Sequence, residues 1–390
     1  MDEPADPTLT SPGPTLGVVG GGQLGRMLGE AAGRLGVEVV VSDPTPDCPA
    51  RPVVRDQVVG DFADAATMRE LAERADVLTY EIELADPDAL EQVGQETGTP
   101  VHPDPDTLRT IQDKLVQNRA YAEAGIPTPA FRRVDDAEDL RAAGEELGWP
   151  LMLKARSGGY DGRGNFPVSG PDEAEGALGE LGGPAIAEAF VEFDRELAVI
   201  GVRGADDRRT FPVTETIHRE EILRESVSPA RTDDATLERA REVARDVLDE
   251  MDGRGETAEP RDGAGEILVN EVAPRPHNSG HWTIEGCHVS QFEQHVRAVL
   301  GWPLGSTGRR DTTVSANVLG DVSEPEPAEL RNVGRALAEP RLSLHWYGKR
   351  EVRPLRKMGH LTAVAGPEEG VAELLERTRA VRDVLTFRSA

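Results

Sequence analysis

The clearest candidates for residues that bind or catalyse are four lysines, which are unusual in a chain this acidic. The 390 residues include 71 Asp plus Glu against 43 Lys plus Arg, and the formal net charge is −28. The lysines are Lys114, Lys154, Lys349 and Lys357. Because primary ammonium groups are this scarce, each lysine is a candidate for binding an anion.

Lys154 precedes a glycine-dense loop in the segment KARSGGYDGRGN, residues 154–165. Such a loop can fold over a polyphosphate, because its backbone N–H groups and Arg163 can meet phosphate oxygens while Lys154 meets another. The alternative is a surface hairpin rich in turn residues. The neighbouring lysine favours the phosphate site.

Two of the four acids in the segment EAFVEFDREL, residues 188–197, are candidate nucleotide contacts. Glu188 and Glu196 flank a short turn, and their carboxylates can accept hydrogen bonds from an adenine amino group or from ribose hydroxyls. Two solvated acids in an acidic protein are an equally good interpretation of these residues alone.

Polar groups also end the apolar strand expected in EILVNEVAP, residues 266–274. Asn270 and Glu271 offer the oxygen ligands that Mg²⁺ takes beside substrate phosphates. The loop that follows carries hydrogen-bond donors suited to a small oxyanion, namely Arg275, His277, Asn278 and Ser279.

A basic segment, HWYGKREVRPLRKMGH at residues 345–360, contrasts with the overall negative charge. It carries Lys349, Arg356 and Lys357 among other cations. A local salt-bridge hub would explain them, but a phosphate monoester on a substrate is the sharper interpretation.

The sequence around these candidate residues predicts a parallel α/β region at the N-terminus, followed by a region of mixed strands and helices. The run TLGVVGGGQLG from Thr15 predicts strand, glycine turn and helix, and Asp43 ends the next strand. This pattern alone fits a nicotinamide-dependent dehydrogenase. Short apolar runs and the amphipathic stretch 232–251 predict further strands and a helix.

Taken together, six motifs resemble one family, the N5-carboxyaminoimidazole ribonucleotide synthases. They are GGGQLGRM, KARSGGYDGRGN, EAFVEFDREL, VNEVAPRPHNSGHWT, NVLG and YGKREVRPLRKMGH, in that order between residue 15 and about residue 366. The resemblance implies an α/β protein with a disordered tail (1–14), a Rossmann-like N-terminal pre-ATP-grasp domain (15–112), an ATP-grasp domain of two α+β lobes (113–310) and a small C-terminal α/β domain (311–390).

The resemblance also implies the reaction. ATP would phosphorylate bicarbonate, with Mg²⁺ or alternatively Mn²⁺ bound, and the carboxyphosphate would carboxylate 5-aminoimidazole ribonucleotide in purine biosynthesis. The glycine loop would close as a lid over this short-lived intermediate. The enzyme would be a cytoplasmic homodimer.

Site residues carry over from the family by position. The ATP site would be Lys114, Lys154, Gly159, Tyr160, Asp161, Gly162, Arg163, Gly164, Asn165, Glu188, Ala189, Phe190, Val191, Glu196, His218, Asn270 and Glu271. The catalytic set would be Tyr160, Asp161, Arg163, Arg275, His277, Asn278 and Ser279, and the ribonucleotide would meet Gln23, Leu24, Glu81, Lys349 and Arg356.

One segment departs from the family pattern. Where the family has an apolar strand with a metal-binding glutamate, this chain has GRGETAEPRDGAG at residues 253–265. Proline and charged residues disfavour a central strand, so we expect that strand to be lost or altered, with Glu259 and Glu271 as the metal pair. A degenerate ATP-binding scaffold is therefore an alternative, as is a sister ATP-grasp enzyme that uses formate and glycinamide ribonucleotide.

Composition limits the remaining possibilities. The negative charge disfavours nucleic acid as a partner, and no apolar run is long enough for a membrane span. Two cysteines, Cys48 and Cys287, indicate neither a disulfide framework nor a thiolate metal site. The carboxylate surplus predicts adaptation to high salt. The alternative is an acidic mesophilic protein from a GC-rich genome, which would explain the preference for arginine over lysine but not the carboxylate surplus.

Overall fold

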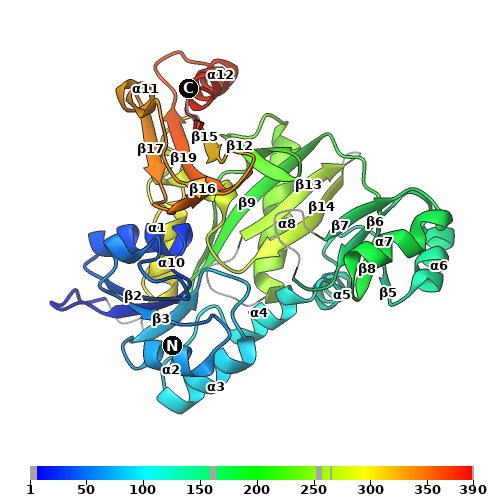
Figure 1. Ribbon diagram of the computed structural model, residues 1–390, viewed down its shortest axis with the longest axis horizontal. Coiled ribbons are helices and arrows are strands. Elements are labelled where there is room, and N and C mark those ends of the chain that lie inside the picture. Colours follow the sequence, from blue (N-terminus) through cyan, green and yellow to red (C-terminus); the bar gives the residue numbers. More distant parts are fainter. Residues whose placement is uncertain (1–6, 159–163, 252–256, 264–265, 389–390) are drawn as a thin grey trace.

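Three regions meet around a large central sheet, and Figure 1 shows them in a computed structural model. The structure describes residues 7–158, 164–251, 257–263 and 266–388, and for 257–263 it describes the backbone. The blue N-terminal region lies below the orange C-terminal strands, and a small lobe around β5 to β8 projects on the opposite side of the central sheet (Figure 1). Residues 7–14, the described part of the predicted tail, contain no helix or strand.

The N-terminal region is a parallel four-stranded sheet with strand order β3-β2-β1-β4. Its strands are β1 (Thr15–Val19), β2 (Glu38–Asp43), β3 (Asp56–Val59) and β4 (Val77–Tyr80). Its helices are α1 (Gln23–Arg34), η1 (Arg51–Val53), α2 (Ala65–Ala72), α3 (Pro87–Thr97) and α4 (Pro105–Gln112). Helix α1 buries Leu24, Met27 and Leu28 against the sheet. The Rossmann-like prediction is confirmed.

The glycine turn between β1 and α1 is shaped by carboxylates. Gly20 adopts a φ of +109°, and a Cβ there would lie 2.5 Å from Cγ of Glu81. The N–H of Gly21 donates to Oδ2 of Asp43 at 3.1 Å, and the N–H of Gly22 donates to Oε1 of Glu81 at 2.6 Å. Two carboxyl groups thus occupy the donors that a dinucleotide phosphate would need, which argues against the dehydrogenase interpretation.

The small lobe is an antiparallel sheet with order β5-β8-β6-β7. Its strands are β5 (Phe131–Val134), β6 (Leu151–Ala155), β7 (Asn165–Val168) and β8 (Ala185–Ala189). Helices α6 (Ala137–Leu147) and α7 (Ala174–Leu181), with η2 (Pro171–Glu173), cover it, and α5 (Lys114–Ala124) leads into it. Leu140, Leu151 and Leu153 are fully buried between sheet and helices.

The central sheet runs without a break from the ATP-grasp region into the C-terminal region, in the order β14-β13-β9-β11-β12-β15-β19-β17, with β10 paired to β9. Its strands are β9 (Arg195–Arg203), β10 (Arg208–Thr210), β11 (Thr214–Arg219), β12 (Ile222–Ser228), β13 (Thr257–Gly263), β14 (Glu266–Ala273), β15 (Thr313–Leu319), β17 (Leu342–Trp346) and β19 (Lys357–Val364). A separate ribbon joins β16 (Glu326–Pro327) to β18 (Glu351–Val352).

Helices flank this sheet along its length. They are α8 (Asp234–Met251), η3 (Asn278–Gly280), α9 (Thr283–Gly286), α10 (Gln291–Val299), α11 (Val333–Ala338) and α12 (Val371–Arg382). The predicted amphipathic helix is α8, which buries Val243, Val247 and Met251 against the sheet. No helix in the described parts of the chain is both long and apolar enough to cross a membrane.

Strand β13 corrects the expectation that its segment could not sit inside the sheet. Its backbone pairs with β14 on one side and with β9 on the other. The register with β14 shifts between Glu259 and Pro260, and β9 pairs with the residues on either side of these two, Ala258 and Arg261. The extra residue is Asn270 of β14, so the ladder is interrupted next to Pro260, where a residue without an N–H donor is tolerated. The strand survives, with Glu259 opposite Glu271.

A buried ion-pair cluster fastens the C-terminal helix α12 to β12. The side chain of Glu225 is fully buried, and its carboxylate accepts hydrogen bonds from Nε and Nη2 of Arg379 at 3.0 and 3.1 Å. Arg382 adds a further contact to Oε1 of Glu225. Burial alone would raise the pKa of Glu225, but the two guanidinium groups bring it below its usual value.

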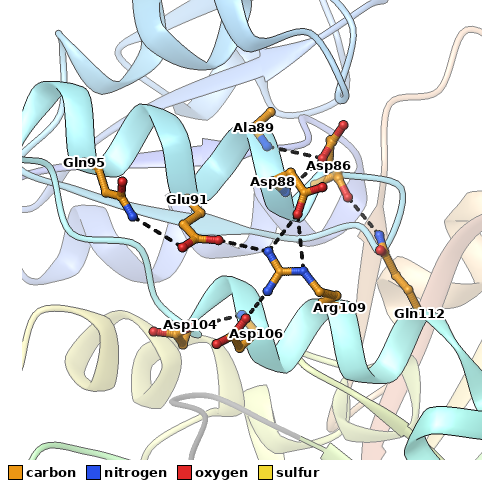
Figure 2. A network of polar contacts seen from close by, with 10 residues as sticks. Asp86, Asp88, Ala89, Glu91, Gln95, Asp104, Asp106, Arg109 and Gln112 are labelled. Atoms are coloured by element: carbon orange, nitrogen blue, oxygen red, sulfur yellow. Dashed lines mark hydrogen bonds and ion pairs between the residues drawn. The ribbon is translucent and has the colours of Figure 1, made fainter.

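Acidic side chains crowd the exposed joint between α3 and α4. Figure 2 shows Arg109 contacted by Asp88, Glu91 and Asp106, with distances of 2.8 Å to Asp88 and 3.0 Å to Glu91. Three carboxylates thus share one guanidinium, and the hydrogen bonds that Arg109 donates to Asp88 and Glu91 raise its pKa. Carboxylates thus outnumber guanidinium groups at this joint, as acidic residues outnumber basic ones in the whole chain.

Candidate functional site

Lys154 joins the small lobe to the central sheet. It stands in β6, 5% exposed, and its Nζ lies 2.5 Å from Oε2 of Glu188 in β8. The same Nζ donates to Oδ1 of Asn270 in β14 at 3.3 Å, and Asn118 in α5 donates to Oε1 of Glu188 at 2.9 Å. Three of the predicted ATP-binding residues therefore meet in one contact set between the lobes.

Other predicted ATP-site residues surround this set. Glu196 in β9 lies 2.6 Å from Nδ1 of His218 in β11. Lys114 begins α5, where its N–H donates to the carbonyl of Arg156 just beyond β6. Ala189 ends β8 and is followed by half-exposed Phe190 and by Val191.

The glycine loop is described only at its end. Gly164 has a φ of +85° and accepts the N–H of Ala155, and Asn165 pairs with Lys154 in the β6–β7 ladder. The other predicted loop residues lie outside the described residues, namely Gly159, Tyr160, Asp161, Gly162 and Arg163. The side chain of Glu259 also lies outside the described part of the chain.

Arg275 follows β14 and reaches the N-terminal region. Its Nη2 lies 2.6 Å from Oε1 of Glu83, beyond β4. Burial would lower the pKa of Arg275, but the charges of Glu83, Glu81 and Glu271 together raise it. A guanidinium that attracts this many carboxylates is held as a fixed cation at the junction of the two regions.

Glu81 lies within the electrostatic reach of both Arg275 and Lys349. Its burial raises its pKa to about 7, although the Gly22 N–H, Arg275 and Lys349 oppose that rise. Lys349 also donates from Nζ to the carbonyl of Lys357 at 2.8 Å. Two predicted ribonucleotide contacts thus share one electrostatic neighbourhood, next to the glycine turn that holds Gln23 and Leu24.

The raised pKa of Glu81 predicts a pH-dependent stability. Its folded pKa exceeds the unfolded value, so its stabilising effect is complete below about pH 4.5 and is lost as the pH rises to about 7. Glu81→Gln keeps the acceptor for Gly22 but cannot ionise. We expect the free energy of unfolding of wild type minus that of Glu81→Gln to fall between pH 5 and 7, by at most about 1.4 kcal/mol per pH unit, and to level off above. Parallel urea-denaturation profiles of the two proteins would contradict this.

Hydrogen bonds hold the oxyanion loop, residues 275–279, which follows β14. Nδ1 of His277 lies 2.9 Å from Oγ of Ser279, and Gln291 in α10 binds both the N–H and the carbonyl of His277, at 3.0 and 2.7 Å. Asn278 and Ser279 open the short helix η3. Because Gln291 clamps the backbone, the side chains of this loop are presented in a fixed arrangement.

Arg356 stands apart from these contacts. Its Nη1 donates to the carbonyl of Glu351 at 2.7 Å, and burial together with Arg353 lowers its pKa. A partly buried guanidinium with a lowered pKa would be stabilised by an anion.

Comparisons with known proteins agree with this geometry. Three family models match successive parts of the chain, the ribonucleotide synthetase preATP-grasp domain at residues 14–112, the ATP-grasp domain at 119–292 and the phosphoribosylaminoimidazole carboxylase C-terminal domain at 313–374. The N5-carboxyaminoimidazole ribonucleotide synthase of Brucella melitensis is 42% identical over 367 residues, covering 92% of this chain and 98% of that protein. The chain belongs to the N5-carboxyaminoimidazole ribonucleotide synthase family.

Solved structures of N5-carboxyaminoimidazole ribonucleotide synthases share the fold. The Thermotoga maritima protein has a TM-score of 0.86 and 39% identity, over 96% of this chain and 99% of that one. The Aspergillus clavatus protein, in complex with ADP and 5-aminoimidazole ribonucleotide, has a TM-score of 0.88 and 36% identity, over 96% and 100%. The predicted class, an ATP-grasp ligase of purine biosynthesis, is confirmed, whereas the dehydrogenase and formate-dependent alternatives lose their support.

Sequence reasoning missed several residues of this synthase-family site. Asn118 binds Glu188, Glu83 pairs with Arg275, and Gln291 clamps His277. Asn118 follows Lys114 by four positions, which places both on one helix face, so its spacing was a usable signal. Glu83 gave none, because its partner Arg275 lies far away in the sequence, whereas Gln291 follows His277 by 14 positions and no helix or strand period relates the two.

Proposed function

We propose that this protein carboxylates 5-aminoimidazole ribonucleotide with ATP and bicarbonate. The bond between the γ-phosphorus and the ADP oxygen breaks while a bicarbonate oxygen bonds to that phosphorus, giving carboxyphosphate. The amine of the ribonucleotide then attacks the carboxyl carbon, the bond from that carbon to the phosphate oxygen breaks, and a proton is released. The products are N5-carboxyaminoimidazole ribonucleotide, ADP and phosphate.

A single observation supports this most strongly. Strand β14 and the loop after it place Asn270, in contact with Lys154, five residues before Arg275, which pairs with the N-terminal region. One short segment therefore contacts both the small lobe, where ATP is assigned, and the N-terminal region, where the ribonucleotide is assigned. Such an arrangement brings two anions together, and positioning with charge neutralisation is the main source of catalysis in phosphoryl transfer.

The residues fit a divalent cation. Glu271 is exposed in β14 beside Asn270, and the strand register sets Glu259 opposite Glu271. Carboxylate and amide oxygens are the ligands that Mg²⁺ or Mn²⁺ takes, and Glu271, Asn270 and Glu259 are the residues we propose to hold it. When bound, the ion neutralises phosphate charge. Within the described residues no group of three or more His, Cys, Asp or Glu side chains forms a metal cluster, so substrate oxygens are expected to complete the coordination.

The remaining roles follow the family pattern. We assign ATP to the set around Lys154, together with Lys114, Glu196 and His218. Arg275, His277, Asn278 and Ser279 are assigned to bicarbonate and carboxyphosphate. The ribonucleotide is assigned to Glu81, Lys349, Arg356 and the start of α1 at Gln23 and Leu24.

The reaction is tested by following ADP release in concentrated KCl with ATP, MgCl₂ and bicarbonate. We expect release to depend on 5-aminoimidazole ribonucleotide, with one carboxylated product for each ADP. Parallel reactions with formate and glycinamide ribonucleotide, and with NAD⁺ or NADP⁺, represent the alternative functions. An equal rate of ADP release with and without 5-aminoimidazole ribonucleotide would contradict the proposal.

We also propose adaptation to high salt. Repulsion among the surplus carboxylates is screened within about 3 Å at 1 M salt. Raising KCl from 0.1 to 2 M should raise the thermal midpoint by roughly 2 °C or more, equivalent to about 2 kcal/mol of relieved repulsion. A variant with the exposed acids Glu123, Glu145 and Glu180 replaced by Gln should show a smaller rise. Equal salt responses in both proteins would count against charge screening.

Two further expectations stay proposals. A reducing cytoplasm suits a chain whose Cys48 and Cys287 are both buried and unbonded. The homodimer implied by the family resemblance is tested by sedimentation velocity in 2 M KCl.

A further inference from the structure

A buried cluster of rings lies between the C-terminal strands and the oxyanion loop. The ring of His360 in β19 stacks on that of His345 in β17, with centroids 4.3 Å apart and planes 8° apart. On its other side it lies 4.8 Å from the ring of His281, which follows η3. None of these imidazoles has a role in the reaction described above.

Hydrogen bonds and burial fix the centre of this cluster. The hydroxyl of Tyr347 lies 2.9 Å from Nδ1 of His360, and Nε2 of His345 lies 2.8 Å from Oε1 of Glu285 at the outer edge. Tyr347, His360 and His281 are each at most 1% exposed. Burial lowers the pKa of both His281 and His360, so neutral rings pack together here.

One end of the cluster leads to the oxyanion loop. Nδ1 of His281 lies 3.3 Å from Nε2 of Gln291, and the same amide clamps the backbone of His277. There is no slack at this point, since a Cβ on Gly280 would lie 2.5 Å from Oε1 of Gln291. A shift of His281 would therefore be passed to His277.

The other end leads to Lys349. Its Nζ lies 5.7 Å from the centroid of the Tyr347 ring, and it donates to the carbonyl of Lys357, the first residue of the strand that carries His360. The loop from Tyr347 to Lys349 and the start of β19 thus hold the ammonium group together. A chain of contacts thus runs from His277 through Gln291, His281, His360 and Tyr347 to Lys349.

We propose that Tyr347, His360 and His281 are positioning residues that fix the separation of His277 from Lys349, and with it the separation of the two substrates. This rests on the proposed function, in which His277 meets the carboxyphosphate and Lys349 meets the ribonucleotide. Carboxyphosphate is hydrolysed if the amine is misplaced, and displacements near 1 Å cost up to about 100-fold in rate. Loosening the cluster therefore separates ATP consumption from carboxylation.

The test compares Tyr347→Phe, His360→Phe and His360→Asn with wild type, measuring ADP and carboxylated product in the same reaction. Tyr347→Phe and His360→Phe should consume about two or more ADP per product and lower kcat for product about tenfold, with KM for ATP unchanged. His360→Asn keeps an amide near the position of Nδ1 and should recover part of the coupling. His288→Asn, at an exposed histidine, is the matched control and should behave as wild type.

The alternative outcomes are distinct. If the variants keep one ADP per product, or lose both activities in proportion to a lower thermal midpoint, the cluster is merely structural and the inference is overturned. Tyr347→Phe removes one atom, so it keeps the question open to test even if His360→Phe does not fold. If wild type itself forms no carboxylated product, the proposed function and this inference fail together.

Discussion

Lys154→Met should reduce kcat/KM for ATP by about 100-fold to 1,000-fold, which corresponds to roughly 3 to 4 kcal/mol of lost transition-state stabilisation. The ammonium group is the point at which Glu188 in the small lobe and Asn270 in the central sheet meet. A bound triphosphate would draw on the same cation. ATP-dependent ADP release and the KM for ATP are the measurements.

The same substitution leaves Glu188 buried without its cation, so stability must be separated from function. Removing one partner of a buried ion pair costs about 3 to 5 kcal/mol, whereas removing both costs much less. The double variant Lys154→Met with Glu188→Gln should therefore regain most of the urea-denaturation midpoint. ATP turnover should stay low in both. Recovery of turnover in the double variant would show that Lys154 serves only the ion pair.

Glu225→Gln is expected to lower the free energy of unfolding by roughly 3 to 5 kcal/mol at pH 7, because it removes a fully buried carboxylate that is the counter-charge of Arg379 and Arg382, whose side chains are 29% and 17% exposed. The pKa of Glu225 is lowered, so its stabilising effect is present above about pH 4.5 and is lost as the pH falls through the folded value. The urea midpoint at pH 7 and at pH 4 measures both statements.

The matched control for Glu225 is an exposed pair of the same chemistry. Glu329 and Arg331 lie 3.1 Å apart with side chains 72% and 45% exposed, so Glu329→Gln should cost less than about 1 kcal/mol. Replacing Glu225, Arg379 and Arg382 together by Leu or Met should restore much of the midpoint. Equal losses for Glu225→Gln and Glu329→Gln would contradict the role of burial.

Local patterns predicted the elements of the site better than its contacts. The motif around Lys154 gave a strand end and the motif around Asn270 gave a second strand, and both are present as β6 and β14. Apolar runs and helical periodicity depend on neighbours in sequence, which is why they were sufficient. The contact of Lys154 with Asn270 depends on how two sheets meet, and no local pattern encodes that.

The error over β13 has a similar origin. The composition of the segment around Pro260 favoured no internal strand, because proline lacks an N–H donor and the segment is rich in charged residues. Composition does not reveal how the segment pairs with its neighbouring strands. The neighbouring strands β9 and β14 supply partners on both sides, and the ladder with β14 is interrupted at Asn270, next to Pro260, where the missing N–H donor is tolerated. Tertiary pairing overrode a local preference, as it commonly does in sheets.

The unbroken central sheet has a consequence for how the chain reaches its folded state. Glu225 in β12 pairs with Ala316 in β15, and all of α8, β13, β14 and α10 lie between them in the chain. Until β15 arrives, β12 is an open edge with unpaired donors and acceptors, the kind of surface on which chains associate wrongly. Strand β15 is therefore synthesised well after β12, the edge strand that it covers. The C-terminal region thus protects the edge of the ATP-grasp sheet from pairing with other chains.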